Sequence, residues 1–205
     1  MSEERPSSGD REINDPRAMR ALAHPARLAI LNKIQTDGAA TATEVAEVVG
    51  VTPSAASYHL RMLAKYGFVE DAPPRGDGRE RLWRRAAGGW SVSPQAGDPP
   101  GVREAKDTLI QVVRDEAAAE FTRALGSIER EPPQWREAST FRRSVLLVEA
   151  EELQELIRRI EELLDPYRVE RRRREGAPEG ARIAEAQVAL FPRAERRPHG
   201  LPSDG

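Results

Sequence analysis

The sequence contains no cysteine among its 205 residues, which excludes disulfides, thiolate metal sites and cysteine nucleophiles. It has no apolar run long enough to cross a membrane, and its first residues are polar and acidic rather than signal-like. We therefore expect a cytoplasmic protein without a membrane partner. A glycine-rich phosphate loop, clustered histidines and an evident carboxylate pair are also missing. An enzyme is the least favoured class, and we expect no catalytic site, metal or cofactor.

The chain has no overall excess of positive charge, because its 32 Lys and Arg residues face 34 Asp and Glu residues. A nucleic-acid binder of this composition must gather its cations on one surface. Residues 53–85 do so, with seven cations against four acids. Binding to phosphates requires such a local excess.

Residues 52–66 have the features of a capped amphipathic helix. Thr52 can cap the N-terminus, and Pro53 fits the first helical position. Ala56, Leu60 and Leu63 recur at intervals of four and three and predict a buried stripe. The other faces carry groups that suit the phosphates and base edges of a major groove, namely Ser54, Ser57, Tyr58, Arg61 and Lys65. By itself, this pattern is more typical of an ordinary surface helix.

The flanking segments predict a winged helix-turn-helix. Before residues 52–66, a short helix over 44–49, capped by Thr43, leads into a turn at Gly50. After them, extended runs flank the turn-forming residues 72–78 and predict a hairpin that acts as a wing. The arginines of this hairpin complete the expected DNA-binding set: Arg75, Arg79 and Arg81. The alternative is an exposed hairpin whose arginines serve solubility.

Three stretches resemble ArsR-type winged-helix transcriptional regulators. Leu22-Ala23-His24-Pro25-Ala26-Arg27-Leu28-Ala29-Ile30-Leu31 looks like their opening motif. Ser57-Tyr58-His59-Leu60-Arg61-Met62-Leu63, followed by Tyr66-Gly67-Phe68-Val69, resembles their recognition helix, and Gly78-Arg79 resembles their wing. The resemblance covers about residues 16–86. It implies a homodimer that binds an inverted-repeat operator in double-stranded DNA, usually as a repressor.

The sequence differs from the metal-sensing branch of that family, which uses Cys and His ligands. The chain has no Cys, and His24, His59 and His199 are widely spaced. The first two lie where the family has structural histidines. We therefore expect no metal sensing.

Residues 102–130 predict one long helix with a single apolar stripe. We expect this stripe to pair with the same helix of a second copy through Leu109, Val113, Phe121, Leu125 and Ile128. The alternative is that the helix packs on its own domain, and both can hold.

The remainder predicts a small β-α-β unit, with strands over 140–148 and 181–191 around an amphipathic helix over 151–164. Residues 171–174 predict a charged loop. This unit could line a pocket for an unknown effector, extend the dimer interface or cap the long helix, and structural support is its default role. The expected pocket residues are Trp135, Phe141, Val188 and Phe191.

The predicted fold class is α+β and mainly helical. Six parts are expected along the chain: a disordered arm (1–12), the winged helix-turn-helix (13–90), a linker (91–101), the long dimerisation helix (102–131), the β-α-β unit (132–192) and a disordered tail (193–205). The predicted function is that of a dimeric DNA-binding transcriptional regulator. The alternative is a protein-interaction module in which the winged helix binds a protein partner.

Overall fold

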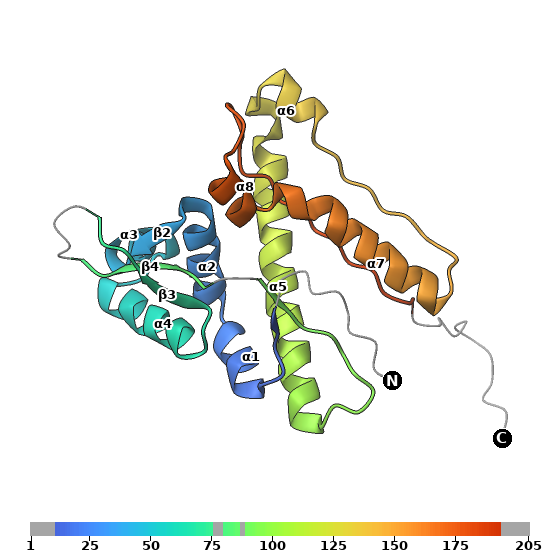
Figure 1. Ribbon diagram of the computed structural model, residues 1–205, viewed down its shortest axis with the longest axis horizontal. Helices are drawn as coiled ribbons and strands as arrows, with labels where there is room; N and C mark the ends of the chain where they lie inside the picture. Colours follow the sequence, from blue (N-terminus) through green and yellow to red (C-terminus); the bar gives the residue numbers. More distant parts are fainter. Residues whose placement is uncertain (1–10, 76–79, 87–88, 194–205) are drawn as a thin grey trace.

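The computed structural model describes residues 11–75, 80–86 and 89–193. The chain is mainly helical, with a winged helix-turn-helix at its N-terminal end and a long helix beside it (Figure 1). Within the described ranges, no helix combines the length and apolar character that a membrane span needs.

The winged helix-turn-helix contains four helices: α1 (Pro16–Leu22), α2 (Pro25–Asp37), α3 (Ala42–Val49) and α4 (Pro53–Lys65). Its sheet has the strand order β2-β4-β3, from β2 (Ala39–Thr41), β4 (Leu82–Arg85) and β3 (Val69–Ala72). Both pairings are antiparallel. The sequence predicted β3 and β4 as the hairpin but not the third strand, because β2 has only three residues.

Polar caps fix where the helices begin. The Asp15 carboxylate accepts a hydrogen bond from the Arg17 backbone N–H, 2.8 Å away, and His24 Nδ1 accepts one from Ala26 N–H at 3.2 Å. Thr41, rather than the expected Thr43, caps α3. Its hydroxyl accepts from Glu44 N–H, and the Glu44 carboxylate accepts from Thr41 N–H, which makes a capping box.

One hydrophobic core holds the four helices and the sheet together. Its fully buried members include Met19, Leu22, Ile30 and Ile34 from α1 and α2. Trp83 of β4 closes it on the sheet side. A two-residue parallel pairing, β1 (Arg11–Glu12) with β5 (Trp90–Ser91), ties the N-terminal segment to the residues that follow the wing.

Helix α5 (Pro100–Ser127) packs on this core only through its first part. Ala105 and Leu109 are buried there, against α1. The prediction that Leu109 pairs with a second copy is therefore wrong, because this side chain is fully enclosed by its own domain. Val113 is also partly buried against the core, whereas Leu125 remains more than half exposed.

A buried ion pair anchors the start of α5. Lys106 is 2% exposed, and its Nζ donates to the Asp98 carboxylate at 2.8 and 3.0 Å and to the Ser93 carbonyl at 2.7 Å. The Lys106 ammonium, together with the Gln95 backbone N–H, lowers the pKa of Asp98. Residues 92–99, which belong to the predicted linker 91–101, are thereby fixed to the helix.

After α5 the chain forms a 3-10 turn (Ile128–Arg130), α6 (Pro133–Glu137), α7 (Ala150–Leu164), a second 3-10 turn (Asp165–Tyr167) and α8 (Val169–Glu175). The predicted break at Pro132 and the helix α7 are confirmed. Residues 171–174 belong to α8 instead of a loop, because they follow a 3-10 turn that restarts the helix.

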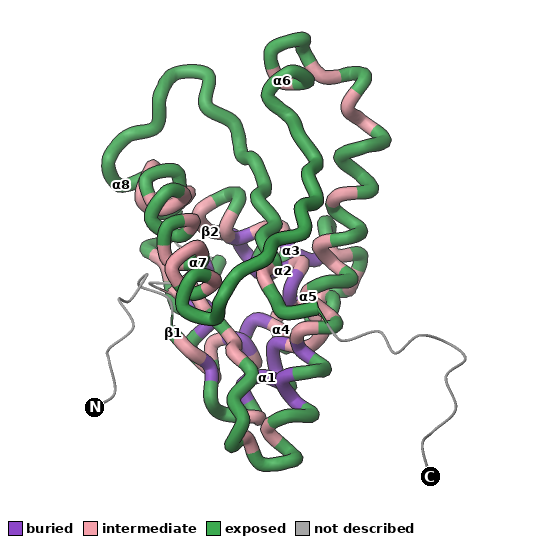
Figure 2. Tube along the Cα trace, turned by 90° about the vertical axis from the view of Figure 1, so that its right-hand side faces the viewer, coloured by how far each residue is buried: buried purple, intermediate pink, exposed green. Residues whose placement is uncertain are grey.

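The two strands predicted over 140–148 and 181–191 are absent. Both segments run along the surface without pairing to any strand within the described residues, so no β-α-β unit forms (Figure 2). Their β-forming residues cannot make a strand without a neighbouring edge to bond to.

Candidate nucleic-acid interface

Helix α4 is held by one face and presents the other. Ala56, Leu60 and Leu63 are fully buried in the core, as the stripe predicted. The Thr52 hydroxyl accepts a hydrogen bond from Ala55 N–H at 3.2 Å, and Pro53 occupies the first turn. Because the buried stripe fixes the rotation of the helix, the residues on its outer face are determined as well.

The expected DNA-binding residues of α4 lie together on that outer face. Ser54, Tyr58, Arg61 and Lys65 are exposed, and Ser57 is half-buried. Arg61 has no ion-pair partner among the residues that the structure describes. An unpaired guanidinium on an exposed helix is available to phosphates or to the acceptor edge of guanine.

A groove of about 220 Å³ separates α4 from the wing. Arg61 and Ser57 line it from the helix, and Arg81 and Trp83 line it from the wing. Thr41, Ala42 and Thr43, at the start of α3, and Glu80 also line it. The sequence reading missed these threonines as lining residues. The capping box of Thr41 and Glu44 is the local signal that could have fixed the start of α3 at these residues.

The guanidinium of Arg81 is less available for contacts with DNA than that of Arg61. Its guanidinium lies 4.0 Å from the Trp83 ring centroid and donates to both oxygens of Asp71, at 2.5 and 2.9 Å. The hydrogen bonds from Arg81 lower the pKa of Asp71. Arg81 therefore lies in the groove with its charge partly neutralised.

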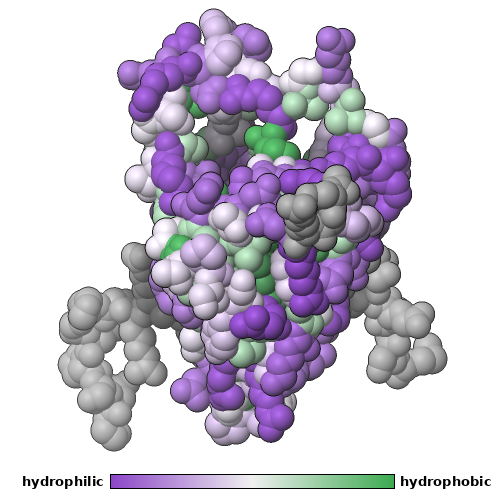
Figure 3. Space-filling model, turned by 90° about the vertical axis from the view of Figure 1, so that its left-hand side faces the viewer, coloured by the Kyte–Doolittle hydropathy of each residue, from purple (hydrophilic) through white to green (hydrophobic). Residues whose placement is uncertain are grey.

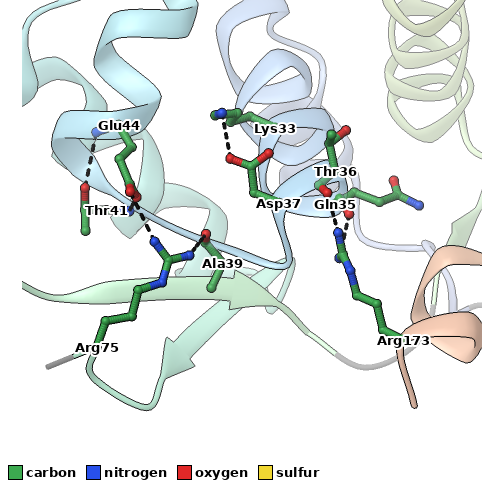
Figure 4. A network of polar contacts seen from close by, with 9 residues as sticks. All are labelled: Lys33, Gln35, Thr36, Asp37, Ala39, Thr41, Glu44, Arg75 and Arg173. Atoms are coloured by element: carbon green, nitrogen blue, oxygen red, sulfur yellow. Dashed lines mark hydrogen bonds and ion pairs between the residues drawn. The ribbon is translucent and has the colours of Figure 1, made fainter. Parts of the chain in front are cut away.

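Arg75 does not join the groove. It donates to Glu44 Oε1 at 3.1 Å and to the Ala39 carbonyl at 2.7 Å (Figure 4). The expectation that Arg75 contacts DNA is not supported, because these contacts attach the wing to β2 and α3. Arg79, also expected to contact DNA, lies outside the described residues.

His24, the N-cap of α2, and His59 of α4 form a half-buried pair. Their ring centroids are 4.9 Å apart, and the Tyr58 ring meets His59 edge-on at 5.7 Å. Burial lowers the pKa of both imidazoles; Arg27 lowers both further, and His24 adds to the effect on His59. Within the described ranges, no group of three or more His, Asp or Glu side chains is placed to hold a metal ion.

The four residues expected to line an effector pocket are not brought together. The Trp135 ring lies 4.9 Å from the Arg182 guanidinium, and the Phe141 ring lies 5.1 Å from Phe121. Val188 and Phe191 are more than half exposed. Phe141, Val188 and Phe191 thus lie exposed on the surface and Trp135 is half-buried, so these contacts do not support the expected pocket.

Among solved structures, the chain is similar to an apo mutant of Lactococcus lactis ZitR, with 17% identity, a TM-score of 0.32 and coverage of 67% of this chain and 83% of that one. It is also similar to wild-type apo MarR from E. coli, with 18% identity, a TM-score of 0.31 and coverage of 72% of this chain and 89% of that one. A mutant MarR from E. coli complexed with operator DNA has 18% identity and a TM-score of 0.32, with coverage of 74% of this chain and 85% of that one.

A search of curated proteins gives no match. The family described as a helix-turn-helix domain matches residues 22–72, which run from the last residue of α1 to the last residue of β3. This span includes α3, the Gly50 turn and α4. The chain therefore contains a helix-turn-helix domain, and β3 and β4 supply its wing.

Proposed function

We propose that the chain is a transcriptional regulator that binds double-stranded DNA in a sequence-specific manner. The observation that carries the proposal is the pairing state of the cations around α4. Arg75, Arg81 and Arg84 each bond to an acid of the sheet or of α3, whereas Arg61 on α4 is exposed and unpaired among the described residues. The free charge is thus concentrated on the helix that a helix-turn-helix inserts into the major groove.

In this proposal Ser54, Ser57, Tyr58 and Arg61 meet base edges, and Lys65 meets phosphates. Arg81 approaches the backbone from the wing. The resemblance to ArsR-type regulators supports a dimeric repressor bound to an inverted repeat. Two α4 helices related by a two-fold axis would then read half-sites about 34 Å apart, or a multiple of that distance.

The test compares two arginines of the same domain. Arg61→Ala should weaken binding to the preferred duplex by about 1 to 3 kcal/mol and relax its sequence preference. Arg75→Ala should leave binding unchanged, because this side chain is already occupied by Glu44 and Ala39. The preferred duplex is first selected from a random library, and affinity is then measured by fluorescence anisotropy over a range of salt concentrations.

Equal losses in the two variants would contradict the assignment of the surface. A wild-type chain whose affinity for duplex does not change with salt would contradict DNA binding altogether, since phosphate contacts release counterions. That result would favour the second candidate, a winged helix that binds a protein.

A further inference from the structure

The C-terminal part of the chain exposes an unusual amount of apolar surface. Leu147 is completely exposed at 102%, and Phe141 is 75% exposed. Nine more large apolar or aromatic side chains are open there: Val145, Leu146, Val148, Ile157, Leu163, Tyr167, Ile183, Val188 and Phe191. In the rest of the described chain only Val48, Tyr58 and Leu125 are comparably open. A soluble protein rarely leaves an apolar surface of this kind uncovered.

The backbone of the same region is also unpaired. Among the described residues, no backbone hydrogen bond involves 140–148 or 182–191, although both segments are extended. Each of them therefore presents a free strand edge. Helix α7, which follows the first of them, has an apolar side but no buried residue. Figure 2 shows these segments as continuous exposed tube, in contrast to the buried residues of the winged helix.

The two extended segments meet the same helix. Phe141 contacts Phe121, and Gln187 Nε2 donates to the Ala117 carbonyl at 2.7 Å, one turn earlier on α5. Leu125, the exposed apolar residue of α5, lies one turn beyond Phe121. The uncovered surface is therefore continuous from the second half of α5 into residues 140–148. Seen from the winged-helix side, much of the surface is hydrophilic, and hydrophobic residues show in a hollow in the upper half of the molecule (Figure 3).

We propose that a second copy of this chain covers this surface, with residues 144–148 of the two copies paired as antiparallel strands about a two-fold axis. A two-fold axis at Leu146 would set Val145 opposite Leu147 of the other copy. It would also set Arg143 opposite Glu149. Apolar residues then meet apolar residues at the centre, Ser144 lies opposite Val148, and the charge at each end of the segment meets the opposite charge.

The segment is thus complementary to itself, which favours a second copy over an unrelated protein. A partner that covers this apolar surface must also be present whenever the chain is made. Another copy of the chain always meets this condition. The interface differs from the one expected along the whole of α5, since the first half of that helix is buried in its own domain. The inference does not depend on DNA binding.

The first experiment is Leu147→Asp in the full chain. Because Leu147 touches nothing that shields it within one copy, the substitution leaves the fold of the single chain unchanged. We expect the dissociation constant of the dimer to rise by about 30-fold or more, as at a central interface residue. Val48→Asp is the matched control, since Val48 is 59% exposed but lies on α3. Molecular mass is measured by light scattering over a range of concentrations, without DNA.

The second experiment uses the absence of cysteine in the chain. In the proposed pairing, Leu146 faces the same residue of the second copy at a Cα separation of about 4.5 to 5.5 Å, within the range that a disulfide spans. Leu146→Cys should therefore cross-link into covalent dimers under mild oxidation, much faster than Val48→Cys. Hydrogen exchange should show protected amides at 144–148 in the wild-type chain and unprotected ones in Leu147→Asp.

A monomeric wild-type chain would overturn the proposal, and so would a Leu147→Asp dimer as tight as the wild type. Equal cross-linking of the two cysteine variants would do the same. These outcomes are separate from those for DNA binding, because Arg61→Ala can abolish recognition of DNA without changing the molecular mass.

Discussion

The reassignment of Leu109 from a dimer interface to a domain core can be tested by comparing it with Leu125 on the same helix. Leu109 is fully buried, whereas Leu125 is 55% exposed. Leu109→Ala removes three carbons from the core, which costs about 2.4 kcal/mol at roughly 0.8 kcal/mol for each. The cavity left behind raises the expected loss of unfolding free energy to about 3 kcal/mol, within the range of about 2 to 5 kcal/mol for such substitutions.

For a chain of this length, a loss of about 3 kcal/mol lowers the melting temperature by roughly 6 to 12 °C. The loss should be the same at every protein concentration, because the side chain acts within one copy. Leu125→Ala should cost less than about 1 kcal/mol within the monomer, because less than half of that side chain is covered. Any larger effect of Leu125→Ala should depend on concentration, since dimerisation stabilises the folded chain by mass action.

The assay is urea unfolding followed by circular dichroism at several protein concentrations. The reasoning fails if Leu109→Ala changes the dimer mass while its unfolding free energy, extrapolated to the monomer, stays at the wild-type value. It also fails if both variants lose the same free energy.

Three further predictions concern stability. The folded-state pKa values of His24 and His59 lie below their usual value of 6.5. The unfolding free energy should therefore be constant above pH 6.5 and fall as the pH drops below it. Urea midpoints at pH 7.5 and 5.5 measure this change, and a His24→Asn/His59→Gln variant should make the unfolding free energy depend less on pH. Lys106→Met should lower the melting temperature by several degrees, because Asp98 loses its cation, and Lys106→Met/Asp98→Asn should recover part of the loss. Thr41→Ala should cost about 1 kcal/mol in urea unfolding through the lost cap of α3, and an unchanged midpoint would contradict the capping box.

The winged helix-turn-helix could be predicted closely because its signals are local. Pro53 and the Thr52 cap fix the start of α4, and the spacing of Leu60 and Leu63 fixes its buried face. Capping, proline and helical periodicity act within a few residues, so they can be read from the sequence without knowing the rest of the fold. The same holds for the break at Pro132 that ends the long helix.

The pairing of the wing arginines could not be predicted in this way. A count of charges over 53–85 does not show that Arg75 reaches back to Glu44, 31 residues earlier, or that Arg81 bonds to Asp71 across the hairpin. Such contacts depend on the strand register, which sets Asp71 opposite Trp83. The charge count therefore overestimated the free positive charge of the wing.

The C-terminal region shows a different limit. Four consecutive apolar residues, 145–148, are typical of a strand buried on both faces, and this pattern predicted a strand. A strand also needs a neighbour whose backbone can bond to it, and the described part of a single chain supplies none. The sequence pattern is thus consistent with a strand that forms between two copies and not within one.

The C-terminal region is also attached to the winged helix at a second point, which bears on how a dimer would position two recognition helices. Arg173 of α8 donates to the Gln35 carbonyl at 2.7 Å and to the Thr36 carbonyl, at the C-terminal end of α2 (Figure 4). Glu170 of α8 lies 3.8 Å from Arg85, the last residue of β4. The region is therefore connected to the winged helix both through α5 and through α8. Two copies joined at 144–148 would hold their winged helices at a separation set by these two connections, and that separation would fix the half-site spacing that the pair can read.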